Sequence, residues 1–240
     1  MVLTLLAIAR TPPVWALDAE SDAIEFHIST NLPVICVREG KLDCIAGRLV
    51  DRACALEGLR YRFTDRPWKR AEEEIVESNG SAFFLVTGKD EGNSKLDWFF
   101  EVYSDEVWIY SFRPLDAESP GRSGLVGVRR GSPFDQIPSQ YGSFSVYALN
   151  NWPSGAMMLK RHRLDAVLAT RLVIEANMVQ SPILADLRGY HKAIGRMGWY
   201  IVRDSRAAPS EAAQRFKRGL EAARAEPWFA EMLASYGVSR

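Results

Sequence analysis

The stretch LVGVRRGSPFD, Leu125 to Asp135, decides how this chain is interpreted. An apolar run ends in two arginines and a glycine at positions 129–131, and the glycine permits a tight turn. Ser132 is a favourable N-cap, Pro133 suits the first helical position, and Asp135 stands where a capping box has its acid. The stretch therefore predicts a strand, a turn and a helix start that suits a small anion. The alternative is a capped helix with nothing bound to it.

Composition places the chain among ordinary globular proteins. It has 240 residues, of which 47% are hydrophobic and 25% charged, enough for two small domains or one large one. Its 30 basic and 30 acidic side chains cancel, which argues against nucleic acid as a main partner. No apolar stretch approaches the roughly 20 residues that a membrane span needs.

The first residues resemble a secretory signal. The run MVLTLLAIA is apolar, prolines follow at positions 12 and 13, and small residues precede an acidic segment. We expect residues 1–16 to be a signal peptide, although the usual basic region before the apolar run is missing, and the protein to be periplasmic. A buried first strand and an ordinary N-terminal helix are the alternatives.

Three cysteines lie in the first quarter of the chain, at positions 36, 44 and 54. Cys36 and Cys44 are placed symmetrically about Gly40, so a hairpin turn over residues 38–41 brings them opposite each other. In an exported protein that pair suits a disulfide. Three buried thiols remain an equally good interpretation.

Hydrophobic patterns predict alternating strands and helices. The strands are expected at 23–29, 59–63, 81–86, 97–103, 106–112, 125–129, 144–149, 164–169 and 199–202. The helices are expected at 47–56, 67–77, 153–162, 171–178, 211–225 and from 227 onward. This order falls into two sets, separated by a Pro-, Gly- and Ser-rich linker over 113–124. It predicts an α/β protein with parallel sheets, in which the last helices return to the first domain.

The same layout resembles the extracellular solute-binding proteins of the polar-amino-acid transporter type. The resemblance runs from about residue 23 to 237 and is carried by dispersed segments. These are Pro67-Trp68, Leu125–Ser132, Leu164–Val167 and the ending WFAEMLASYG. The resemblance implies a type II periplasmic-binding-protein fold with two α/β lobes, a two-strand hinge and a cleft between the lobes. The first lobe would be residues 18–110 plus 199–240, and the second 111–198.

The site that this resemblance implies differs from the pattern of amino-acid binders. Those proteins hold the ligand carboxylate with an arginine after a threonine pair. Here Thr87 matches the first threonine, Lys89 stands at the second, and no arginine occurs from Thr87 to Asp97. Thr170 stands where the family has an aspartate for the ligand ammonium. The residues expected to line the site are Trp68, Thr87, Lys89, Arg130, Gly131, Ser132, Thr170 and Arg171. This set favours an anionic or polar solute; solvated surface charges are the alternative.

Other candidates add little. Trp152 is a second aromatic residue for stacking, whereas Trp98 and Trp108 lie on apolar strands and are assigned to the core. The spacing of the three histidines, at positions 27, 162 and 191, supports no metal site, and no cofactor is expected.

These observations predict a monomeric periplasmic protein that captures a small polar solute for a membrane permease. One alternative is a sensory or interaction protein that kept the clamp and lost transport. The other is an enzyme, but the chain has no nucleophile elbow, phosphate loop, H-E-x-x-H or dinucleotide glycine motif.

Overall fold

The computed structural model describes residues 23–78, 80, 82–88, 95–114, 124–136, 145–208 and 210–238. The predicted signal segment, most of the 113–124 linker and Lys89 lie outside these residues. Among the described residues, no helix is both long and apolar enough to cross a membrane.

Eight strands form one sheet in the order β4-β1-β5-β10-β6-β9-β7-β8. Their bounds are β1 Ala23–Ile28, β4 Arg60–Asp65, β5 Ala82–Gly88, β6 Leu96–Ser111, β7 Leu125–Arg129, β8 Ser145–Leu149, β9 Ala166–Thr170 and β10 Tyr190–Asp204. In the first half of the sheet β1 runs parallel to β4 and β5, and in the second half β7 runs parallel to β8 and β9. The predicted α/β class with parallel strand sets is confirmed.

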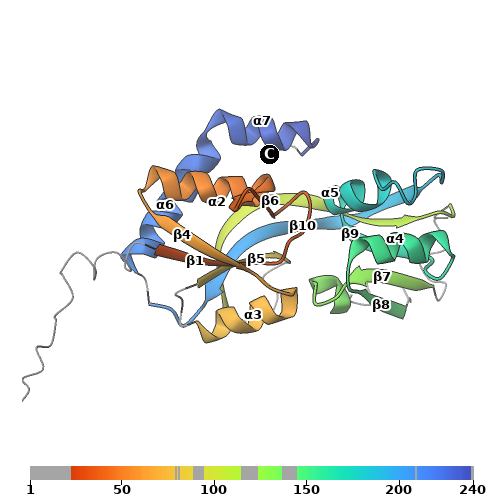
Figure 1. The fold of residues 1–240 in the computed structure, drawn as a ribbon, viewed down its shortest axis with the longest axis horizontal. Helices are drawn as coiled ribbons and strands as arrows, with labels where there is room; N and C mark the ends of the chain where they lie inside the picture. Colours follow the sequence, from red (N-terminus) through yellow and green to blue (C-terminus); the bar gives the residue numbers. More distant parts are fainter. Residues whose placement is uncertain are drawn as a thin grey trace, which may run out of the picture.

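The long strands β6 and β10 join the two halves. They pair with each other in antiparallel fashion along most of their length, and Figure 1 shows them running from the first half of the sheet into the second. On one side β10 pairs with β5, and on the other β6 pairs with β9. The lobe boundaries expected at 110/111 and 198/199 fall inside these two strands.

Helices cover both faces of the first half of the sheet (Figure 1). Their bounds are α2 Cys44–Leu56, α3 Trp68–Glu77, α6 Glu211–Ala225 and α7 Pro227–Ser235. The adjacent β5 residues Phe83 and Phe84 show why that strand is apolar throughout: Phe83 packs on Phe216 of α6, and Phe84 packs on Trp68 of α3. Ser210 caps α6 by accepting a hydrogen bond from the Ala213 amide at 3.1 Å, as its sequence position predicted. The last helices thus pack against the first half of the sheet.

Two strand predictions were wrong in length. The sequence indicated separate strands at 97–103 and 106–112, but β6 is continuous from Leu96 to Ser111. It also indicated a strand over 199–202 only, whereas β10 begins at Tyr190. In both cases hydrogen bonds from the partner strand keep the chain extended where its own residues lack a strand pattern.

The predicted helix after β7 is also corrected. Residues Pro133–Gln136 form a four-residue 3-10 turn, η1, and residues 137–144 lie outside the described chain. The Ser132 hydroxyl has no hydrogen-bond partner among the described residues, so the expected N-cap bond is not formed there. In the second half, α4 spans Trp152–Lys160, and α5 spans Arg171–Ile174 and continues as a π-helical turn, η3, over Glu175–Val179.

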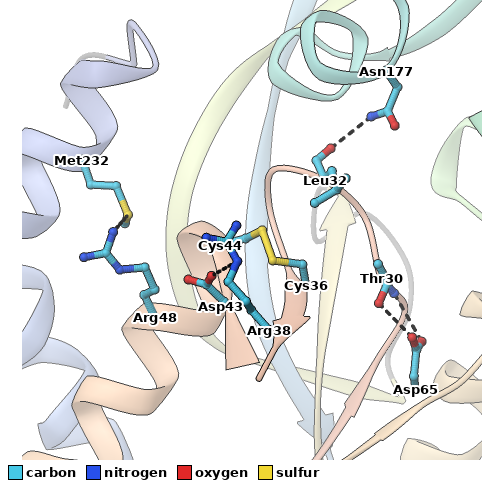
Figure 2. The surroundings of a disulfide bond; sticks show 10 residues. All are labelled: Thr30, Leu32, Cys36, Arg38, Asp43, Cys44, Arg48, Asp65, Asn177 and Met232. Carbon is cyan, nitrogen blue, oxygen red and sulfur yellow. Dashed lines mark hydrogen bonds and ion pairs between the residues drawn. A yellow bond between two sulfur atoms is a disulfide. The ribbon is translucent and has the colours of Figure 1, made fainter. Parts of the chain in front are cut away.

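The predicted cysteine hairpin is confirmed. β2 Cys36–Arg38 pairs with β3 Lys41–Asp43, and the two turn residues Glu39 and Gly40 both have positive φ. Of the two open interpretations, the structure has the disulfide: Cys36 and Cys44 are bonded, with their Cα atoms 5.6 Å apart (Figure 2). Cys54 is a free thiol, and burial raises its pKa to about 12.

Candidate ligand site

The two halves of the sheet meet where their parallel strands end. The segment after β1 contributes Asn31, whose Oδ1 accepts a hydrogen bond from Trp152 Nε1 of α4 at 3.3 Å. It also contributes the carbonyl of Leu32, which accepts from Asn177 Nδ2 of η3 at 3.2 Å (Figure 2). Open α/β sheets bind ligands at the carboxyl ends of their strands, so this junction is the candidate site.

The turn after β7 lies directly against the first half. Within the turn, the Ser132 amide donates to the Arg129 carbonyl at 3.0 Å, and Gly131 has a φ of +75°. A β-carbon added at Gly131 would lie 3.3 Å from the backbone nitrogen of Lys69, at the start of α3. The Pro133 ring lies 3.8 Å from the position of a β-carbon on Gly88, at the end of β5. The turn is therefore one wall of the junction.

Replacing Gly131 with alanine is expected to lower the free energy of unfolding by about 2 kcal/mol, part of it from the positive φ and part from the Lys69 contact. Gly40 is the matched control, because it has a φ of +74° and nothing within 4 Å of an added β-carbon. Gly40→Ala should cost only about 1 kcal/mol, the backbone part alone. Urea unfolding of both variants checks this. Equal losses would mean that the turn does not touch α3 in solution.

The structure brings Trp68, Thr87, Gly131 and Ser132 to this junction. Trp68 is buried, packs edge-on against Phe84, and approaches Gly131 with its Cδ1 atom. Thr87 lies beside Trp199 in the β5–β10 ladder, and its hydroxyl donates to the Gly198 carbonyl at 3.2 Å.

The other expected residues are placed differently. Arg130 is exposed and donates from Nε to Asn150 Oδ1 at 2.9 Å, which holds it against the end of β8. Arg171 donates to Glu175 and to the Tyr236 carbonyl, each at 2.9 Å, and its Nε lies 3.5 Å from Asp105. Both guanidinium groups are thus held by other parts of the protein. Lys89 lies outside the described residues.

Two hydroxyl groups near the ends of the second-half strands are buried. Ser132 is 7% exposed and Thr170 is 1% exposed. Neither hydroxyl has a hydrogen-bond partner among the described residues. Burying a hydroxyl without a partner is unfavourable, so both are candidates to bind a ligand or water.

Sequence reasoning missed Arg129, the last residue of β7. Its side chain is half-buried; desolvation lowers its pKa, and the Asp65 carboxylate at the end of β4 opposes that shift. The alternation of side chains along a strand is the sequence signal that could have identified Arg129. Val126 and Val128 point into one apolar cluster, which leaves Arg129 on the opposite face of β7 from these two valines.

Three other tryptophans are packed within the protein. Trp152 is buried, Trp108 stacks on His191 with ring centroids 3.9 Å apart, and Trp98 is half-buried against Tyr200. Among the described residues, no group of three or more His, Cys, Asp or Glu side chains is arranged to hold a metal ion. Two cavities, of about 480 and 390 Å³, flank β6 near α7 and Arg171 rather than the turn after β7.

Comparison with known proteins identifies the fold. No protein-family model matches the sequence, and no curated protein matches it closely enough to count. Among solved structures, it is similar to the arginine-, lysine-, histidine-binding protein ArtJ from Geobacillus stearothermophilus, with a TM-score of 0.73 and 13% identity over 91% of this chain and 96% of that one.

Two further structures agree. An ancestral arginine-binding protein bound to arginine gives a TM-score of 0.68 at 18% identity, over 90% of this chain and 98% of that one. The GluR0 ligand-binding core in complex with L-glutamate gives 0.70 at 14% identity, over 89% and 97%. These likenesses confirm the type II periplasmic-binding-protein fold that the sequence predicted.

Proposed function

We propose that this protein is a periplasmic solute-binding protein that traps a small polar or anionic solute between two lobes and presents it to a membrane permease. The lobes are residues 18–110 with 199–240, and residues 111–198. The observation that carries the proposal is the junction itself, where strand ends from both halves meet beside the buried Ser132 hydroxyl, which has no hydrogen-bond partner among the described residues. The protein acts by binding rather than by catalysis, as a monomer.

Several features support this role. The solved structures of the same fold include proteins described as binding arginine, lysine, histidine or glutamate, and another described as the substrate-binding protein of an amino acid ABC transporter. The Cys36–Cys44 disulfide fits an oxidising compartment outside the cytoplasm. The long strands β6 and β10 are suited to a hinge, because they are the pair that runs from one half to the other.

A ligand screen by thermal shift tests the proposal. A ligand that binds only the folded state stabilises it by about 2.7 kcal/mol at a hundredfold excess over Kd. We expect at least one small polar solute to raise the melting temperature and to reduce the radius of gyration in X-ray scattering as the lobes close. A panel of amino acids, organic acids and amines that leaves both quantities unchanged would contradict the proposal.

A sensory role is the second candidate. It is favoured by the similarity to GluR0, whose solved fragment is described as a ligand-binding core. The two roles differ in their partners. Co-purification with a permease supports transport, and co-purification with a sensor kinase or cyclase supports signalling.

A further inference from the structure

We propose that Arg129 binds the anionic end of the solute, so that the cleft takes a solute bearing a carboxylate and holds it on the second lobe. The inference rests on the proposed solute-binding function and names the ligand class of the same site. In the amino-acid binders that the sequence resembles, the carboxylate-binding arginine would lie on the first lobe instead.

The position of Arg129 is fixed by the sheet. β7 and β9 are parallel neighbours, with Val126 beside Ala166 and Gly127 beside Val167. Continuing that register pairs Arg129 with Ala169, so that Thr170 is one residue further along β9 and on the opposite face of the sheet. Ser132 is tied to Arg129 through the hydrogen bond between the Ser132 amide and the Arg129 carbonyl. Arg129 and the buried Ser132 hydroxyl therefore lie at the end of β7 and the buried Thr170 hydroxyl at the end of β9, and neither hydroxyl has a hydrogen-bond partner in the described part of the chain.

The bonding of Arg129 sets it apart from Arg130 and Arg171. Those two residues donate to side chains or carbonyls of the protein. The Arg129 side chain makes no hydrogen bond or ion pair in the described part of the chain, although it has lost part of its hydration. A guanidinium group that is desolvated without a partner is costly, and an oxyanion that binds it in a bidentate manner removes that cost.

Asp65, at the end of β4 in the first half of the sheet, supplies the opposite charge. Its carboxylate is exposed and accepts hydrogen bonds from Thr30, from the hydroxyl at 2.8 Å and from the amide at 3.3 Å (Figure 2). It influences Arg129 electrostatically without forming an ion pair with it among the described contacts. A solute with a carboxylate at one end and a hydrogen-bond donor at the other complements both groups.

Calorimetric titration of the full-length protein tests the inference, with amino acids, four- to six-carbon dicarboxylates and diamines as probes. We expect the wild type to bind at least one carboxylate-bearing probe. Arg129→Gln should weaken that binding by at least ~30-fold, since it removes one partner of a desolvated charge pair. Arg129→Lys keeps the charge but loses the fork, and should weaken it about tenfold. Arg130→Gln, the matched control, should stay within about threefold.

The outcomes separate the two proposals. If the wild type binds a carboxylate-bearing probe and Arg129→Gln binds it equally well, the inference is overturned and the solute-binding function stands. If the wild type binds only diamines, the inference is likewise overturned and the solute-binding function stands. If no probe binds, the proposed function itself fails. Should Arg129→Gln not fold, the Arg129→Lys titration decides, because that variant keeps the length and charge of the side chain.

Discussion

Alanine in place of Asp105 is expected to lower the free energy of unfolding by about 3–5 kcal/mol, the range for breaking a buried charged network. Asp105 lies in the middle of β6 and is 2% exposed. Its carboxylate accepts hydrogen bonds from the backbone amides of Leu172 and Glu106, both at 2.9 Å, and lies 3.5 Å from Arg171. Alanine leaves the start of α5 uncapped and the buried Arg171 without that carboxylate.

The control for this variant is Glu106→Gln. Glu106 is the next residue on β6 and accepts a hydrogen bond from Trp108 Nε1 at 2.9 Å. Glutamine keeps an oxygen that accepts this bond, so the loss should stay below about 1 kcal/mol. Urea denaturation of both variants gives the two values. A loss from Asp105→Ala as small as that from Glu106→Gln would contradict the structural role of the buried carboxylate.

The same residue makes the stability of the fold pH-dependent. Burial raises the pKa of Asp105 above its ordinary value of 3.8, and Glu175 adds to this, while hydrogen bonds and Arg171 oppose it. The folded state therefore binds a proton at Asp105 that the unfolded state has already released. This residue's contribution to stability is greatest below pH 3.8 and falls as the pH rises through the higher folded pKa.

Comparison with Asp105→Asn isolates that contribution, because asparagine does not titrate. The free energy of unfolding of the wild type should fall relative to this variant as the pH rises above 3.8. Asp204 and Asp186 act in the opposite direction, since hydrogen bonds from Arg206 and Lys160, respectively, lower their pKa values. They are present in both proteins, so their effect cancels in the difference. A difference that does not change with pH would contradict the raised pKa.

Asp105 also explains why the sequence predicted two strands where the structure has the single strand β6. The polar pair Ser104-Asp105 interrupts an apolar pattern and indicates the end of a strand. The carboxylate is satisfied by Leu172, which is 67 residues further along the chain, so no local pattern reveals that the strand continues. In β10 the register shifts between Ala193 and Gly195, and the alternation that marks a strand is lost at that point.

The helices were easier to predict because their signals are local. Ser210 is the N-cap of α6, as the sequence indicated, and α3 begins at Trp68, one residue after its predicted start at Pro67. The continuous apolar run of β5 also predicted a strand buried on both faces. Elements whose own residues carry the cap or the pattern were predicted within a few positions.

The candidate site was only partly predictable, for a related reason. The sequence identified the turn after β7 and predicted Arg130 as its ligand-binding cation, whereas we propose Arg129. The choice depends on Asn150, which accepts a hydrogen bond from Arg130, and on Asp65, which lies in the other half of the sheet. Likewise, Arg171 is held by the Tyr236 carbonyl. Whether a charged side chain is bound by the protein or available to a ligand depends on partners that are distant in sequence, and a linear pattern does not show these partners.

Removal of the disulfide is expected to lower the free energy of unfolding by about 2–3 kcal/mol, the chain-entropy value for a loop this short. The bond spans 8 positions, from Cys36 to Cys44, and closes the β2–β3 hairpin onto the start of α2. The first amides of α2 donate to the segment before the hairpin, from Ile45 to the Pro33 carbonyl at 3.1 Å and from Ala46 to the Val34 carbonyl at 2.8 Å.

That segment is the part of the first half that reaches across the junction through Asn31 and Leu32. The disulfide therefore supports the site as well as the fold. A Cys36→Ser/Cys44→Ser variant should show faster amide hydrogen exchange over residues 29–35, in addition to its lower stability. If the segment exchanges at the wild-type rate in the variant, the disulfide supports only the hairpin.

Dithiothreitol gives the control for this variant. It should lower the melting temperature of the wild type toward that of the double variant. It should leave the double variant unchanged, because that protein has no disulfide to reduce. The buried thiol of Cys54 is present in both proteins and so does not affect the comparison. Alkylation and mass spectrometry of the unfolded chain should count one thiol before reduction and three after it, from the one free cysteine and the one disulfide. Three thiols before reduction, in protein purified from an oxidising compartment, would contradict the bond. In that case the positive φ of 69° at Cys44 would be held by backbone hydrogen bonding alone.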